Sequence, residues 1–146
     1  MNDIFGFLAV VVVGPLVGAE FAVARFFNPI VGRLPDAAFR AARSGSSALL
    51  GKVMPFWYIA SLVLLVACTL VAHSPLIAIA TGLMVVIVAL TVLVLVPINN
   101  RIARWADDAS AADESARQLA ARWDRLHWLR VTLLAVLFVL LVVGSR

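Results

Sequence analysis

The sequence predicts an all-α polytopic membrane protein, folded as an antiparallel bundle of four transmembrane helices. Hydrophobic residues make up 64% of the 146 residues and charged residues only 14%, a composition outside the range of soluble domains. A helix needs about 20 mostly apolar residues to cross a bilayer, and four such stretches follow one another. The predicted spans are Ile4 to Phe26, Met54 to Ala72, Leu76 to Ile98 and Leu126 to Ser145. Because they use most of the chain, we expect one membrane domain at residues 1–146, in contact with the lipid bilayer.

The charge pattern predicts the orientation of these spans. The net charge is +4, and the basic residues gather in the connections after the first and third spans, whereas residues 73–75 between the second and third spans include no Lys or Arg. The positive-inside rule then makes loops 1 and 3 cytoplasmic and places both termini outside. This explains the positive charge without a nucleic-acid partner. Because no basic segment precedes the first span, we expect it to be retained, and the expected location is the bacterial inner membrane.

The first span and the loop after it contain small residues and helix breakers. Gly14 and Gly18 form a small-residue stripe, which suits close helix packing either within the chain or in a homo-oligomer. Asn28-Pro29 is expected to end this helix. A short interfacial helix is then predicted from Pro35-Asp36 in loop 1, followed by a turn at residues 44–47.

Characteristic residues mark the ends of the other three spans. Trp57 and Tyr58 begin the second span, either as an interfacial aromatic belt or as the lining of a pocket. Residues 73–75 predict a tight hairpin. Pro97 weakens the end of the third span. Since neither glycine nor proline occurs between Asn99 and Gly144, one helix is expected from about residue 111 through the fourth span, with a cytoplasmic extension.

Two spans are too short unless they include charged residues. Residues 131–144 cover only about 21 Å at 1.5 Å per residue, against about 30 Å of hydrocarbon, so the fourth span must reach back to Arg130 and His127. Residues 4–19 cover about 24 Å, which brings Glu20 to the inner edge of the first span.

Asn99 lies at the same depth, at the inner end of the third span. Trp123, His127 and Arg130 share one helix face, which should point into the bundle because ionisable groups avoid lipid. We therefore predict that Glu20, Asn99, His127 and Arg130 converge in one cavity on the cytoplasmic side.

Each of these residues also has a purely structural interpretation. Arg130 can reach the headgroups with its long side chain, and Glu20 can serve only as its counter-ion. His127 can be a hydrogen-bonded bundle residue, and Asn99 with Asn100 can cap the end of the third helix. The single cysteine, Cys68, excludes an intramolecular disulfide. No familiar enzyme motif and no metal site are found, so no cofactor is predicted, with metal and haem left open.

Several segments resemble a known family of small four-helix membrane proteins, the DUF1772 class, also called the anthrone oxygenase family. The matching segments span nearly the whole chain: Gly18-Ala19-Glu20-Phe21, Asn28-Pro29, Leu34-Pro35, Val96-Pro97-Ile98-Asn99-Asn100-Arg101-Ile102, and Arg122-Trp123-Asp124-Arg125-Leu126-His127-Trp128-Leu129-Arg130. Many members of the family carry Asn at the position of His127.

The resemblance implies an enzyme that oxidises anthrones to anthraquinones with O2 and without a bound cofactor. An anthrone has an acidic CH2 group, so Glu20 or His127 would act as the base. Arg130 and Asn99 would stabilise the oxyanion. The expected contacts to a hydrophobic aromatic substrate come from Trp57, Tyr58, Trp123, Asn28 and Asn100.

A second class of function stays open at this point. In a non-enzymatic membrane subunit or lipid-binding module, Glu20 and Arg130 would only hold the bundle together. Transport by a monomer is disfavoured, because four short helices without an internal repeat are unlike known transporter folds.

Overall fold

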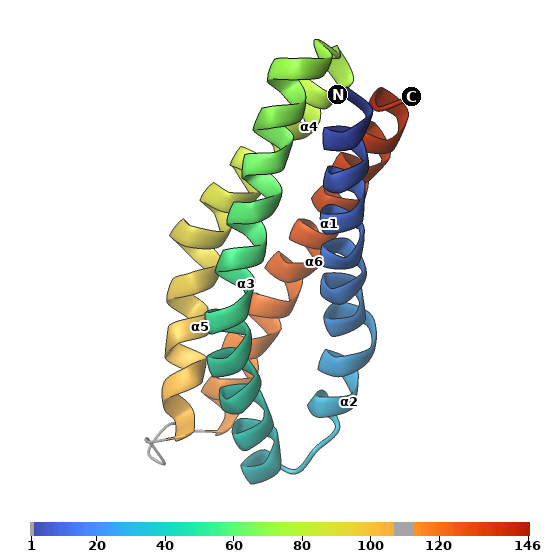
Figure 1. Ribbon diagram of the computed structural model, residues 1–146. Coiled ribbons are helices and arrows are strands. Elements are labelled where there is room, and N and C mark those ends of the chain that lie inside the picture. The colour runs from blue at the N-terminus through green and yellow to red at the C-terminus, as the bar shows by residue number, and fades with distance from the viewer. Residues whose placement is uncertain (1, 107–112) are drawn as a thin grey trace.

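The computed structural model describes residues 2–106 and 113–146, and almost all of them are helical (Figure 1). No strand occurs in the described residues. In chain order the elements are α1 (Asn2–Ala22), the π-helical turn η1 (Val23–Phe27), α2 (Asn28–Gly32), α3 (Asp36–Ala72), α4 (Pro75–Leu90), the π-helical turn η2 (Thr91–Leu95), α5 (Val96–Ala103), the 3-10 turn η3 (Arg104–Ala106) and α6 (Asp113–Gly144).

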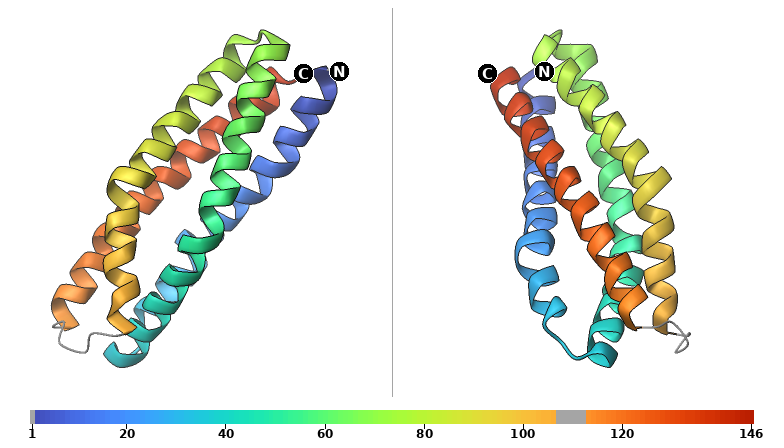
Figure 2. Two further views of the ribbon diagram at one scale, coloured as in Figure 1. Left: turned by 60° about the vertical axis from the view of Figure 1, so that its left-hand side comes forward. Right: turned by 180° about the vertical axis from the view of Figure 1, so that it is seen from behind.

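These elements form four long antiparallel helices, which confirms the predicted fold class. Four stretches are long and apolar enough to cross a membrane: Ile4–Gly32, Asp36–Ala72, Pro75–Ala103 and Ser115–Gly144. Both termini lie at the end of the bundle where α3 turns into α4 (Figures 1 and 2). At that turn His73 adopts a left-handed conformation with φ 50°, and Pro75 begins α4, as the hairpin signal predicts.

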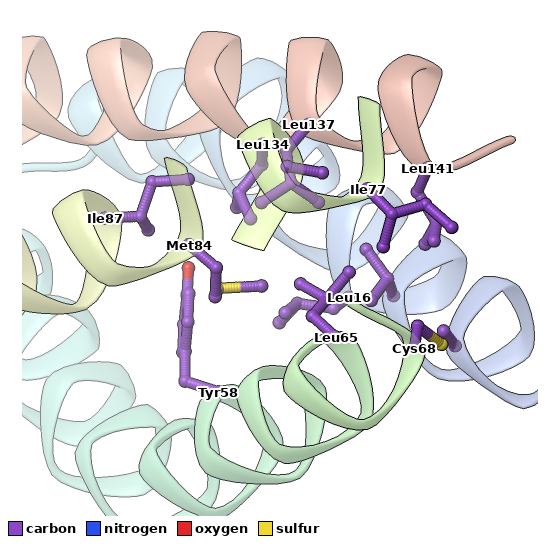
Figure 3. Close-up of a cluster of buried hydrophobic side chains, with 13 residues drawn as sticks. Leu16, Tyr58, Leu65, Cys68, Ile77, Met84, Ile87, Leu134, Leu137 and Leu141 are labelled. Atoms are coloured by element: carbon purple, nitrogen blue, oxygen red, sulfur yellow. The ribbon is translucent and has the colours of Figure 1, made fainter. Parts of the chain in front are cut away.

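The largest apolar cluster, whose side chains Figure 3 shows, lies in the half of the bundle nearer the termini, and two smaller clusters lie toward the other end. Leu16 of α1, Leu65 of α3, Met84 of α4 and Leu137 of α6 are fully buried in the largest cluster. By contrast, many large apolar side chains point outward, such as Phe56, which is 77% exposed. An apolar exterior over most of the length of the bundle is what contact with lipid acyl chains requires.

The small-residue stripe of α1 is used within the chain at one of its two glycines. A Cβ on Gly14 would lie 3.4 Å from the ring of Phe138 in α6, whereas nothing lies within 4 Å of the position on Gly18. Gly14 therefore lets α6 pack closely against α1.

The helix break predicted at Asn28-Pro29 is wrong, because the first helix continues to Gly32. The turn before the proline widens into η1, where the N–H of Asn28 donates to the carbonyl of Val23 five residues back. The third helix repeats this arrangement, with η2 just before Pro97. A wider turn moves the carbonyl that a proline ring would otherwise meet, so the helix accommodates the proline without ending.

The separate interfacial helix and the turn predicted at residues 44–47 are also wrong. Helix α3 runs without a break for 37 residues, about 55 Å at the usual rise. Its small residues face α5: Asn99 Nδ2 donates to the carbonyl of Ser47 at 3.0 Å, and a Cβ on Gly51 would lie 3.1 Å from the same nitrogen. Close packing thus outweighs the weak helix propensity of serine and glycine.

The long final helix is present as predicted. Helix α6 begins at Asp113 and continues without interruption to Gly144. The expected start near residue 111 lies outside the described residues. The helix is longer than the apolar stretch at residues 126–145, so it extends the bundle at the end opposite the termini (Figure 2).

Candidate functional site

Four polar side chains are buried together between α1, α3 and α6. They are Glu20, Tyr58, His127 and Arg130, which we call the buried polar cluster. None of them is more than 6% exposed, and His127 is fully buried. Such groups are unfavourable inside a membrane bundle unless they satisfy one another, and in this cluster most of their polar atoms do. Arg130 Nε is buried and bonds to no described residue.

The Glu20 carboxylate is the centre of the cluster. Its Oε1 accepts a hydrogen bond from the Tyr58 hydroxyl at 2.6 Å, and its Oε2 accepts one from Arg130 Nη2 at 2.8 Å. His127 Nδ1 lies 3.3 Å from the same Oε2. Glu20 is therefore bound to α3 through a phenol and to α6 through a guanidinium, and one carboxylate joins three helices.

The contacts of His127 define which ring nitrogen carries the proton. Arg130 Nη2 lies 2.9 Å from His127 Nδ1, and a guanidinium can only donate, so Nδ1 accepts. His127 Nε2 lies 3.1 Å from the Glu20 backbone carbonyl, which can only accept, so Nε2 donates. This arrangement matches a neutral imidazole. The Trp123 ring stacks on it with centroids 4.6 Å apart, which fixes its plane.

Arg130 also reaches the third helix. Its Nη1 donates to the Thr91 hydroxyl at 3.4 Å, and its guanidinium carbon lies 5.4 Å from the centre of the Tyr58 ring. Thr91 is the first residue of η2, and η1 begins three residues after Glu20. The cluster is thus flanked by both π-helical turns, a type of distortion that is frequent at functional sites.

The structure brings together three of the four residues predicted to converge. Glu20, His127 and Arg130 are in contact, but the amide of Asn99 is bonded to α3 at Ser47 instead. The three side chains are buried and bonded to one another. Asn100 is exposed.

Among the predicted aromatic contacts, the structure gives each residue a specific partner. Trp57 Nε1 donates to the carbonyl of Val12 at 2.9 Å, linking α3 to α1. Trp123 covers His127, and Tyr58 is a hydrogen-bond donor to Glu20. The role of the Tyr58 hydroxyl was missed, as was Thr91, because nothing in the sequence near them signals a contact on another helix.

A second polar site lies closer to the end of the bundle opposite the termini. Arg43 of α3 forms a two-pronged ion pair with Asp124 of α6, with N to O distances of 2.8 and 2.6 Å. Arg117 of α6 donates to Asp36 at 2.8 Å and to the carbonyl of Leu34 at 3.0 Å. The sequence-based assignment of this part of α3 to the membrane surface missed the first pair, because Arg43 is buried inside the bundle.

These two ion pairs border a cleft of about 310 Å³ between η1 and α2 on one side and α3 and α6 on the other. Its polar lining is Asn28, Arg43, Arg117 and Asp124, and its aromatic walls are Phe39 and Trp128. Within the described part of the chain, Asn28 Nδ2 and Arg43 Nε are buried and have no hydrogen-bond partner. Asn28 therefore lines this cleft rather than contacting the buried polar cluster, and its role in ligand binding stays a prediction.

The cleft and the buried polar cluster are neighbours. Ala24 of the cleft lies one helical turn beyond Glu20, and Asp124 lies one turn before His127. Among residues 2–106 and 113–146, no group of three His, Cys, Asp or Glu side chains could hold a metal ion.

Comparison with known proteins adds one finding to this geometry. The family described as anthrone oxygenase has a model that matches residues 7–140. No curated protein and no solved structure matches the chain. The matched region includes all four long helices, the buried polar cluster and the cleft. The chain therefore belongs to the anthrone oxygenase family.

Proposed function

We propose that this protein binds a hydrophobic aromatic molecule within the membrane bundle and oxygenates it with O2, without a cofactor. The substrate would be anthrone-like, with a CH2 group that is acidic because it lies between aromatic rings and opposite a carbonyl. The observation that carries this proposal is the buried polar cluster, found in a chain of the anthrone oxygenase family. A buried carboxylate and imidazole beside a guanidinium are the groups that a deprotonation reaction needs.

The proposed reaction begins with removal of one proton from the CH2 group by Glu20 or His127. The resulting enolate passes electrons to O2, and a new C–O bond gives a hydroperoxide. Loss of water then leaves a carbonyl, so one CH2 group and one O2 become one C=O group and one water molecule. The protein supplies the base and holds the enolate, and O2 is the oxidant.

In this step, the hydrogen bonds that Glu20 accepts would pass to the substrate. While Glu20 is ionised, its carboxylate accepts bonds from Tyr58 and Arg130. Once it takes a proton its charge is lost, and both donors are released to stabilise the new oxyanion of the substrate. Tyr58 and Arg130 replace the pair of Arg130 and Asn99 expected from the sequence, because the Asn99 amide is bonded to Ser47.

The test is O2 consumption by the purified protein with an anthrone, compared with Glu20→Gln and His127→Ala variants. We expect the variant that lacks the base to lose about 10² to 10⁴ in rate. Anthrones also oxidise slowly without protein, so reactions without protein and with heat-denatured protein set the background. Unchanged turnover in both variants, with the fold intact by circular dichroism, would eliminate the mechanism.

A non-enzymatic role is the second candidate, favoured by one specific observation. Both carboxylate oxygens of Glu20 are already bonded within the chain, as expected of a cluster that only fixes the register of three helices. In that role, turnover with anthrones would not exceed the background. Removing both charges with Glu20→Gln and Arg130→Met would leave a folded protein that still binds its ligand or partner.

The orientation in the membrane is part of the proposal. The arginine-rich end with the 33–35 connection would face the cytoplasm of a bacterial cell, with both termini outside. Labelling of a cysteine placed at Ser145 by a membrane-impermeant reagent on intact spheroplasts tests this. Labelling only after the membrane is broken would reverse the assignment.

A further inference from the structure

The cleft beside Asn28 and Arg43 is a candidate binding site separate from the buried polar cluster. It lies between three helices and has apolar as well as polar walls, and its volume of about 310 Å³ is that of a small-molecule site. None of the four residues of the buried polar cluster lines it.

Two hydrogen-bond donors of residues that line the cleft have no acceptor among the described residues. Asn28 is 6% exposed and Arg43 is 4% exposed, yet Asn28 Nδ2 and Arg43 Nε bond to no described residue. Buried donors are nearly always paired, because an unpaired one loses its bonds to water and gains none in return. Both atoms belong to residues that line the same cleft, so one bound molecule with acceptor oxygens would satisfy them.

The charges around these donors favour an uncharged acceptor. Both terminal nitrogens of Arg43 are bonded to the Asp124 carboxylate, and Arg117 is bonded to Asp36. Each arginine of the cleft thus already has its counter-ion. A carbonyl or phenol oxygen can accept a bond from Arg43 Nε without displacing Asp124, whereas an anion would meet that carboxylate at close range.

The walls of the cleft favour a flat ring. Phe39 is buried at one side with the Arg117 guanidinium 4.5 Å from its ring centre, and Trp128 stands half-exposed at another. Aromatic side chains of this kind pack well against planar ligands.

We propose that the cleft binds a planar, uncharged aromatic ketone or quinone, with Asn28 Nδ2 and Arg43 Nε donating hydrogen bonds to its carbonyl oxygens. The proposal rests on the binding half of the proposed function and not on the oxygenation step. Because the cleft adjoins the buried polar cluster through Ala24 and Asp124, a molecule held there by its oxygens lies beside the candidate bases. The same chemistry fits an anthrone-like substrate and a quinone of the membrane.

The test compares two ligands of nearly the same shape with the intact protein in lipid nanodiscs. Anthraquinone has two carbonyl oxygens, anthracene has none, and neither can undergo the proposed oxygenation, so binding is measured independently of turnover. We expect anthraquinone to bind at least tenfold more tightly than anthracene, from quenching of tryptophan fluorescence. Equal affinities would overturn the proposal even if no variant folds.

Two variants with matched controls locate the site. Asn28→Ala and Arg43→Lys each remove one orphaned donor, and the lysine keeps the charge opposite Asp124. Each should weaken anthraquinone binding by about three- to tenfold and leave anthracene binding unchanged. Gln118→Ala and Arg125→Lys alter an exposed amide and an exposed guanidinium of α6 outside the cleft, and should change neither. Folded variants that bind anthraquinone as the parent does would overturn the proposal.

Competition distinguishes the two sources of such a ligand. A short-chain ubiquinone analogue that displaces anthraquinone at similar concentration identifies the membrane quinone as the ligand. Displacement by an anthrone alone identifies the substrate. Displacement by phospholipid alone would overturn the assignment to an aromatic ketone or quinone. Loss of oxygenation with retained anthraquinone binding would refute the proposed function but not this site.

Discussion

The two ionic sites of this bundle differ in how far they are open to solvent. In the buried polar cluster, Glu20 and Arg130 are 3% and 7% exposed at their side chains, and bonds from α3 and α6 converge on one carboxylate of α1, although Arg130 Nε bonds to no described residue. In the cleft, Arg43 is equally buried but Asp124 is 30% exposed, and Asn28 Nδ2 and Arg43 Nε bond to no described residue. The first site is closed to solvent and its charged groups are bonded to one another, whereas the second borders an open cleft. In the proposed function, the first site would take the proton and the second would hold the ligand.

A third ion pair lies at the surface of the protein. Arg117 and Asp36 are 38% and 48% exposed, so the three pairs form a series from dry to wet. Water screens charges and replaces lost hydrogen bonds, so the energetic effect of breaking a pair should fall along this series.

The largest effect is expected at the buried polar cluster. Arg130→Met leaves the Glu20 carboxylate buried without its cation and should lower the free energy of unfolding by about 3–5 kcal/mol. The double variant Glu20→Gln, Arg130→Met should lose clearly less, since no charge is left uncompensated. Thermal unfolding in detergent measures both, with Arg125→Met as the exposed control. Equal losses in the single and double variants would show that the pair is not coupled.

A smaller effect is expected at the cleft. Asp124→Asn keeps the shape of the side chain but leaves the Arg43 guanidinium without a counter-ion, and should cost about 1–3 kcal/mol. Partial access of water to Asp124 limits the loss. The measurement is the same unfolding experiment, and a loss as large as that of Arg130→Met would break the proposed difference between the two sites.

The smallest effect is expected at the surface pair. Asp36→Asn should cost less than about 1 kcal/mol, and the loss should shrink as salt is added. Arg117 keeps its bonds to the carbonyls of Gly32 and Leu34 in this variant. Unfolding at low and high salt measures the effect. A large loss of stability that salt does not change would show that water does not screen the pair of Asp36 and Arg117.

The sequence predicted the depth of the polar residues in the membrane better than the direction in which each side chain points around its helix. The thickness of a bilayer places Glu20, His127 and Arg130 at one level, and the structure joins them. Asn99 was assigned to the same cluster because depth alone does not say which way a side chain points around its helix. Its amide faces α3.

The main error in the predicted fold also affected the prediction of the candidate site. Residues 44–47, Ser-Gly-Ser-Ser, have low helix propensity and were interpreted as a turn. Packing inside the bundle favours the helix at two of them, because Ser44 and Ser47 are buried and the Ser47 carbonyl accepts a bond from Asn99 of α5. Because α3 is continuous, Arg43 lies inside the bundle rather than on the membrane surface. There it forms part of the lining of the cleft.

The widened turn η1 has a consequence for how the two sites are aligned. Leu16, Glu20, Ala24 and Asn28 follow one another in steps of four, and all are buried. In an ordinary α-helix, with about 100° per residue, Asn28 would be rotated about 120° away from Leu16. A single π-helical turn absorbs roughly one residue, or about 100° of that rotation. If this turn were an ordinary α-helical turn with the same number of residues, Asn28 would swing out of the cleft while Glu20 kept its place. Deleting one residue from the turn would instead straighten the helix and leave Asn28 in line. The widened turn thus corrects the helical phase and keeps Glu20 and Asn28 on one line.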